Sequence, residues 1–193
     1  MIAATTTTAV PVAWLVARAA GLTALALLSA SLWLGLSMSV RLLAPRRQKS
    51  LMGWHQTLMW CGLSMVALHG IALLLDPVMH FSIAVVLVPG LAPWRPLAVS
   101  AGVITAWLML ALASSFHVRR RITQRRWRLI HYAGFAAFAL ALGHGLTAGT
   151  DLRGLTGLIV AGGLAAPAVW LVYARILVPR PQPQRRQPTA GAA

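Results

Sequence analysis

The chain has 193 residues, of which 59% are hydrophobic and only 10% charged, and this composition excludes an ordinary soluble globular domain. It indicates an integral membrane protein. Seventeen lysines and arginines stand against two acidic residues, but they lie between apolar runs, as membrane topology requires, so the excess does not predict binding to nucleic acid. The single cysteine, Cys61, excludes an internal disulfide and a cysteine-based metal site.

The ends of the chain differ from its middle. Residues 1–10 are polar, with a run of four threonines, and we expect them to form a disordered lead. Residues 179–193 are rich in proline and arginine and predict a disordered basic tail. Residues 11–178 lie between these ends and predict one membrane domain, whose first apolar run is too long for a cleaved signal peptide.

Five apolar segments predict an all-α membrane protein built as a bundle of five transmembrane helices. In chain order they are Val12–Leu43, Leu51–Leu75, Leu97–His117, Leu129–Ala148 and Leu155–Val178. Asp76 and Pro77 end the second segment, and Pro167 can kink the fifth. Residues 78–96 hold an apolar run too short to span a bilayer and predict an external loop.

The basic residues predict the orientation of these helices. The segment Arg119–Arg128 carries six arginines and is expected to be a cytoplasmic loop. With the N-terminus outside and the C-terminus inside the cytoplasmic (plasma) membrane, fourteen basic residues lie on the cytoplasmic side. Only Arg18, Arg95 and Arg153 lie outside. The second and fourth helices then run in the same direction.

Four histidines lie in these two parallel helices, and an ionisable group in a membrane span usually faces the bundle interior and has a function. His55 and His69 are 14 residues apart, and His131 and His144 are 13 apart, so each pair spans roughly 20 Å of helix. Parallel helices would bring His55 to His131 and His69 to His144. Two facing imidazoles suit the two axial positions of a haem iron better than zinc, which prefers four ligands. The sequence therefore predicts two stacked b-type haems.

The 13-residue spacing is harder to reconcile with a regular helix. Fourteen steps of about 100° return to nearly the same face, but thirteen steps end about 140° away from it. Either the haems lie at different positions around the fourth helix, or the turn near Gly134 or Gly143 is over-wound. These alternatives are open at the level of sequence.

On these residues the chain resembles the ferric reductase-like transmembrane domain family, the haem-carrying core of ferric-chelate reductases and NADPH oxidases, which is related to the haem subunit of a bacterial methionine sulfoxide reductase system. The resemblance covers roughly residues 45–150. It rests on the two spaced histidine pairs, on the motif Trp94-Arg95-Pro96, and on the basic approach Arg125–His131 to the fourth helix.

The resemblance implies that His55 and His131 hold a haem on the cytoplasmic side, and that His69 and His144 hold one on the outer side. Arg95 is a candidate contact for a haem propionate, whereas Arg18 either extends to the membrane interface or pairs with an outer propionate.

Family members move electrons from a cytoplasmic flavin to an outer acceptor such as ferric iron or a redox protein. The chain has no glycine-rich dinucleotide fingerprint and no room for a flavin domain, so we expect a separate flavin reductase to be its donor. It would then be the membrane haem subunit of an oxidoreductase without a dehydrogenase domain of its own. The alternative is a small transporter or structural subunit that uses the histidines for protons or for a metal ion.

Overall fold

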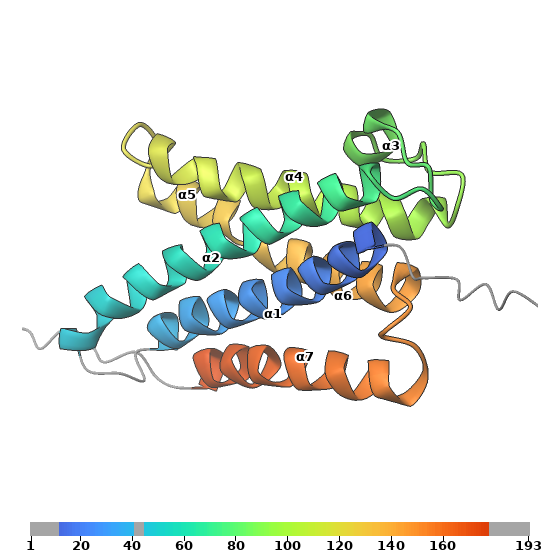
Figure 1. Ribbon diagram of the computed structural model, residues 1–193. Coiled ribbons are helices and arrows are strands. Elements are labelled where there is room, and N and C mark those ends of the chain that lie inside the picture. Colours follow the sequence, from blue (N-terminus) through green and yellow to red (C-terminus); the bar gives the residue numbers. More distant parts are fainter. Residues whose placement is uncertain (1–11, 41–44, 178–193) are drawn as a thin grey trace, which may run out of the picture.

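The computed structural model describes residues 12–40 and 45–177, and all the regular structure in this part of the chain is helical (Figure 1). Five helical stretches are long and apolar enough to cross a membrane. The prediction of an all-α, multi-pass membrane protein is therefore confirmed. The lead at residues 1–10 and the tail at residues 179–193 lie outside the described residues.

The spans agree with the predicted segments to within a few residues at most ends. The helices are α1 (Val12–Val40), α2 (Pro45–Leu74), α3 (Ile83–Leu87), α4 (Pro96–Val118), α5 (Gln124–His131), α6 (Ala133–Ala148) and α7 (Gly154–Leu177). The second span begins six residues earlier than predicted, and the predicted external loop contains the short α3. Ser82 caps α3, because its hydroxyl accepts a hydrogen bond from the backbone N–H of Val85 at 3.3 Å.

Successive spans alternate in direction, so α2 and the continuous path of α5 and α6 run the same way (Figure 1). The last residues of α1, α4 and α7, the first residues of α2 and the whole of α5 therefore lie at the same end of the bundle. The described basic residues at this end are Arg46, Arg47, Lys49, Arg119, Arg120, Arg121, Arg125, Arg126, Arg128 and Arg175. Both acidic residues, Asp76 and Asp151, lie in the loops at the other end.

Helix α1 is the centre of the bundle and packs against α2, α6 and α7. Its buried positions are mostly small, including Ala17, Ala20, Ala24 and Ser31, and small residues let membrane helices approach closely. The indole N–H of Trp33 donates to the carbonyl of Leu164 on α7 at 3.1 Å, one turn before Pro167. Such bonds satisfy backbone groups near a proline inside a membrane helix.

The basic segment before the fourth span corrects one prediction. Residues 124–131 were expected to lie partly in a loop, but they form α5, which begins after Thr123. The Thr123 hydroxyl accepts a hydrogen bond from the N–H of Arg126 at 3.4 Å. This cap, together with arginines that are good helix formers, explains why the helix begins before the apolar run.

A break at Tyr132 separates α5 from α6 and bears on the 13-residue spacing. The N–H of Tyr132 bonds to the carbonyl of Leu129 at 3.2 Å as well as to that of Arg128 at 3.1 Å, and the N–H of Phe135 bonds to the carbonyl of Tyr132 at 3.0 Å. Bonds to the third preceding residue tighten the turn to about 120° per residue, which rotates His144 toward the face of His131. Over-winding near Gly134 is therefore the alternative that the structure supports.

Candidate functional site

The four histidines of the second and fourth spans meet in two pairs at two levels of the bundle. The ring centroids of His55 and His131 are 6.1 Å apart, and those of His69 and His144 are 6.2 Å apart. The ring planes within each pair are nearly perpendicular, at 73° and 83°. These are the pairs that the sequence predicts. We call His55 and His131, which lie toward the basic end of the bundle, the inner pair, and we call His69 and His144 the outer pair. The end of the bundle that holds both acidic residues is named the outer end in the same sense.

The separation within each pair fits one metal ion between two imidazoles. A metal–imidazole bond is about 2.0 Å long and a ring centroid lies about 1.1 Å behind its nitrogen, so two imidazoles that share one metal ion have centroids roughly 6.2 Å apart. The observed 6.1 and 6.2 Å match this value. Rings in direct contact would not need to keep this distance at both levels.

Three of the four imidazoles are oriented by a backbone carbonyl of a neighbouring helix. Nδ1 of His55 lies 2.8 Å from the carbonyl oxygen of Ser31. Nδ1 of His69 lies 2.7 Å from the carbonyl oxygen of Ala17, and Nδ1 of His144 lies 2.8 Å from that of Ala98. Because a carbonyl only accepts, Nδ1 must carry the proton in all three rings. Nε2 is then the nitrogen with a free lone pair, as metal ligation requires.

The same three imidazoles lie against glycines of the neighbouring helices. A methyl group added at Gly102 would lie 2.7 Å from Cε1 and Nδ1 of His144, and one added at Gly21 would lie 3.0 Å from Nδ1 of His69. At Gly35 the nearest atom, Cε1 of His55, would be 3.3 Å away. Each glycine therefore provides the space that one ring occupies.

A backbone carbonyl and a glycine contact each of these three rings together, and we call this pair the carbonyl–glycine motif. In each case the carbonyl belongs to the residue four positions before the glycine, as in Ala17 and Gly21, Ser31 and Gly35, and Ala98 and Gly102. Positions i and i+4 lie on one face of a helix, so both groups meet the same ring. These carbonyl and glycine positions were not predicted, although a small residue followed by glycine at i+4 was a signal for them.

His131 is held differently from the other three. The indole ring of Trp127, one turn earlier on α5, stacks on it with centroids 4.9 Å apart and planes inclined by 18°. Nδ1 of His131 and Nε1 of Trp127 are both buried and have no hydrogen-bond partner among the described residues. Trp127 therefore contacts the inner pair through His131.

A cavity of about 230 Å³ surrounds the outer pair. Besides His69 and His144, mainly apolar residues line it, and it reaches the turn between α6 and α7. Its charged lining residues are Arg18 of α1 and Asp151 of that turn. The cavity therefore joins the outer histidine pair to a charged pair at the outer end of the bundle.

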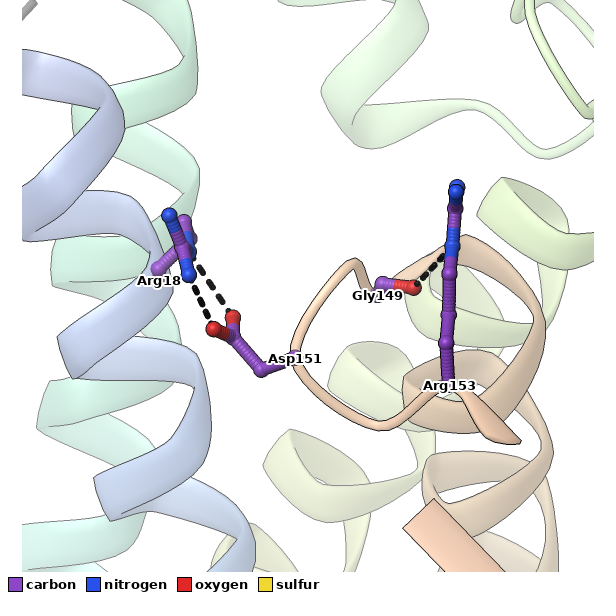
Figure 2. A network of polar contacts seen from close by, with 4 residues as sticks. All are labelled: Arg18, Gly149, Asp151 and Arg153. Carbon is purple, nitrogen blue, oxygen red and sulfur yellow. Dashed lines mark hydrogen bonds and ion pairs between the residues drawn. The ribbon is translucent and has the colours of Figure 1, made fainter. Parts of the chain in front are cut away.

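Figure 2 shows Asp151 reaching from the turn toward Arg18, while Arg153 lies beside Gly149. Arg18 donates from Nε to one carboxylate oxygen of Asp151 at 2.8 Å and from Nη2 to the other, so the pair is bidentate. This hydrogen bonding lowers the pKa of the Asp151 carboxyl below its usual value. Arg153 donates to the carbonyl of Gly149 at 3.4 Å.

Arg95, the candidate propionate contact from the sequence, makes two contacts inside the chain. Its guanidinium donates to the carbonyl of Thr147 and lies over the indole ring of Trp94, 4.8 Å from the ring centroid. Trp94 itself lines the outer cavity. Arg95 has a left-handed backbone conformation, with φ of 46°, immediately before α4.

The remaining ionisable groups stand apart from the two pairs. His80 lies in the loop after α2, and His117 lies in the last turn of α4 against Phe116. In the part of the chain that the structure describes, no three histidine, cysteine, aspartate or glutamate side chains gather as a metal site would require. Among these residues a four-ligand zinc centre is therefore unsupported, and the donor set at each level is two imidazoles, which fits the axial ligation of a haem.

Comparisons of the chain with protein-family models, with curated proteins and with solved structures found no match. The resemblance to a known family therefore stays a prediction from the sequence motifs.

Proposed function

We propose that this protein is the membrane part of an electron-transfer system and holds two b-type haems, one between His55 and His131 and one between His69 and His144. In this proposal electrons enter at the basic end of the bundle and leave at the other end. The chain would be the haem subunit of a ferric reductase-like oxidoreductase in the cytoplasmic membrane.

The observation that carries the proposal is the geometry of the two histidine pairs. Both pairs have the centroid separation expected of two imidazoles that share one metal ion, and both lie between parallel spans. The two histidines of each span are roughly 20 Å apart along the helix, so the pairs lie at two depths. Two unrelated packing contacts would have no reason to repeat this spacing at two depths.

The chain's own residues would prepare each level for its ligand. The carbonyls of Ala17, Ser31 and Ala98 keep Nδ1 protonated and turn Nε2 into the ligating atom. The mainly apolar lining of the outer cavity would suit the apolar faces of a haem beside His69 and His144. When bound there, a haem would supply a one-electron carrier at each depth of the membrane.

The charge distribution supports the choice of donor. Most arginines of the segment from Arg119 to Arg128 are exposed. Arg119 lies over the indole ring of Trp127, 5.6 Å from its centroid, and this ring stacks on His131 of the inner pair. Such a surface would attract an acidic partner and raise its association rate at low salt. A cytoplasmic flavoprotein suits this role, because a hydride donor releases two electrons and a haem accepts one at a time.

Transport or structural use of the histidines has weaker support. A proton path would need ionisable groups between the two levels, but the imidazoles lie roughly 20 Å apart along each helix. Their Nδ1 atoms are also committed to backbone carbonyls at three of the four positions.

The haem content of the purified protein tests the proposal. We expect two low-spin b haems per chain by visible spectrum and pyridine haemochrome assay. His55→Ala should lose the inner haem and His69→Ala the outer one, because each substitution removes one of two axial ligands. His80→Ala and His117→Ala are matched controls and should keep both. Wild-type protein with no haem, or ligand variants with unchanged content, would refute the proposal.

The route of the electrons needs a separate test in liposomes that contain haem-loaded protein and an outer ferric acceptor. We expect NADPH alone to reduce the haems slowly. NADPH with a flavin reductase should reduce them rapidly, and added salt should slow the reaction because it screens the basic surface. Rapid reduction by NADPH alone would contradict the need for a separate flavoprotein.

A further inference from the structure

Arg18 is placed where a ligand of the outer cavity would meet a positive charge. It lines the same cavity as His69 and His144, and it directly follows Ala17, whose carbonyl orients the ring of His69. The backbone segment that orients the His69 ring therefore also positions the Arg18 side chain. Arg95 and Arg153, the other arginines at this end, bond to backbone carbonyls instead.

The contact with Asp151 orients the guanidinium of Arg18 but uses only some of its N–H donors. An arginine has five N–H donors in a fixed planar fork. Asp151 takes Nε and one hydrogen of Nη2, so Nη1 and the second Nη2 hydrogen remain for another acceptor. A carboxylate matches this fork better than any neutral group, because the hydrogen bonds are charge-assisted at both ends.

We propose that Arg18 is a carboxylate-binding residue at the outer end of the cavity, and that Asp151 is its positioning residue. This inference rests on the proposed function, because the ligand is expected next to the outer histidine pair. The carboxylate has two sources with the same chemistry. One is a propionate of the outer haem, and the other is a soluble carboxylate chelate of ferric iron that reaches the cavity from outside.

The first arm of the test measures how the protein retains its haem. Arg18→Gln keeps a polar side chain but shortens it and removes its charge, and Arg153→Gln, which makes the same change, is the matched control at the same end. If a propionate is the ligand, Arg18→Gln should release the outer haem to an apo-globin acceptor about tenfold faster and lower its midpoint potential. Asp151→Asn should also speed the release of the outer haem, but less than Arg18→Gln does, because it keeps the Arg18 guanidinium and weakens its orientation.

Esterified haem tests the same contact in the wild-type protein and so does not depend on the folding of a variant. Haem dimethyl ester has no ionised propionate, and wild-type protein loaded with it should lose its outer haem as fast as Arg18→Gln does. Combining the two changes should add little, because both remove one interaction.

The second arm tests the soluble source with reduced, haem-loaded protein. We compare oxidation by ferric citrate with oxidation by ferric acetylacetonate, a neutral complex without carboxylates. If the chelate is the ligand, the ratio of the two rates should fall about tenfold in Arg18→Gln and stay unchanged in Arg153→Gln.

An effect of Arg18→Gln, absent from Arg153→Gln, in either arm supports the inference and identifies the source of the carboxylate. The inference is overturned if Arg18→Gln behaves as Arg153→Gln in both arms, whether or not esterification changes haem release. In that case the wild-type protein still holds two haems and the proposed function stands. Wild-type protein without haem would overturn both.

Discussion

A single side-chain problem recurs at three of the four histidines. An imidazole in a membrane span must satisfy Nδ1, keep Nε2 available, and find room beside a neighbouring helix. The carbonyl–glycine motif solves all of these with two residues on one helical face, in Ala17 and Gly21, for example. Only His131 uses a different support, the stacked ring of Trp127.

This motif predicts a graded response to glycine substitution. Gly102→Ala would place its methyl group 2.7 Å from the ring of His144, which is too close to be accommodated without moving the ring, whereas Gly35→Ala would place it 3.3 Å from His55. We expect Gly102→Ala to lose most of its outer haem and Gly35→Ala to keep most of its inner haem. The measurement is haem content and low-spin spectrum at equal protein.

Two glycines provide matched controls for these substitutions. Gly143 precedes His144 and Gly53 lies two residues before His55, but a methyl group at either would meet no atom within 4 Å. Both should tolerate alanine, which also favours helix formation by about 1 kcal/mol. Equal haem loss in Gly102→Ala and Gly143→Ala would show that helix packing in general, rather than clearance of the ring, determines haem binding.

At the scale of elements, α1 serves as the scaffold for both levels, although it contributes no histidine. Its two carbonyl–glycine motifs are 14 residues apart, the same spacing as His55 and His69 on the antiparallel α2. The fourth span instead matches α2 by breaking at Tyr132. The histidines of the second and fourth spans are spaced differently, but their imidazole rings meet in pairs at both levels.

The break at Tyr132 predicts a strong effect of helix insertion. One alanine inserted between Ala133 and Gly134 would rotate His144 by about 100° relative to His131 and shift it by about 1.5 Å. We therefore expect the purified variant to lose one of its two haems. An alanine inserted between Arg121 and Ile122, before α5, leaves the residues between the two histidines unchanged and should preserve both. Two intact haems after the first insertion would mean that the spacing does not depend on this break.

At the scale of the whole molecule, charge is separated between the two ends of the bundle. The described basic residues concentrate at the end that includes α5, whereas both acids lie at the other end. Large apolar side chains such as Trp60, Trp107 and Trp170 are exposed on the sides of the bundle. Because lipid tails cover apolar surface, this pattern suits a molecule that spans a bilayer. The positive-inside rule predicts that its basic end faces the cytoplasm.

Cysteine labelling tests the orientation. In a Cys61→Ser background, Gln124→Cys at the start of α5 and Thr150→Cys in the turn before α7 both place a thiol at an exposed position. We expect an impermeant maleimide to label Thr150→Cys from outside intact cells and Gln124→Cys only after permeabilisation. Labelling of both from the same side would refute the proposed topology.

Much of the architecture was predictable from sequence, because its signals are local. Apolar length specified the five spans, and the alternation of basic segments predicted parallel second and fourth helices. With those directions known, the spacing of the four histidines was enough to predict which rings meet. The start of α5 was placed too late, because an arginine-rich helix has no apolar run to mark it.

Only the tertiary structure decided how the rings are held. The bond from His69 to Ala17 joins residues 52 apart, and the bond from His144 to Ala98 joins residues 46 apart. The pairing of Arg18 with Asp151 joins residues 133 apart, and both residues line the outer cavity, one from α1 and the other from a distant turn. Hydropathy and charge report what each segment faces, lipid or water, but a hydrogen bond between helices depends on their relative rotation, which the packing of the whole bundle determines.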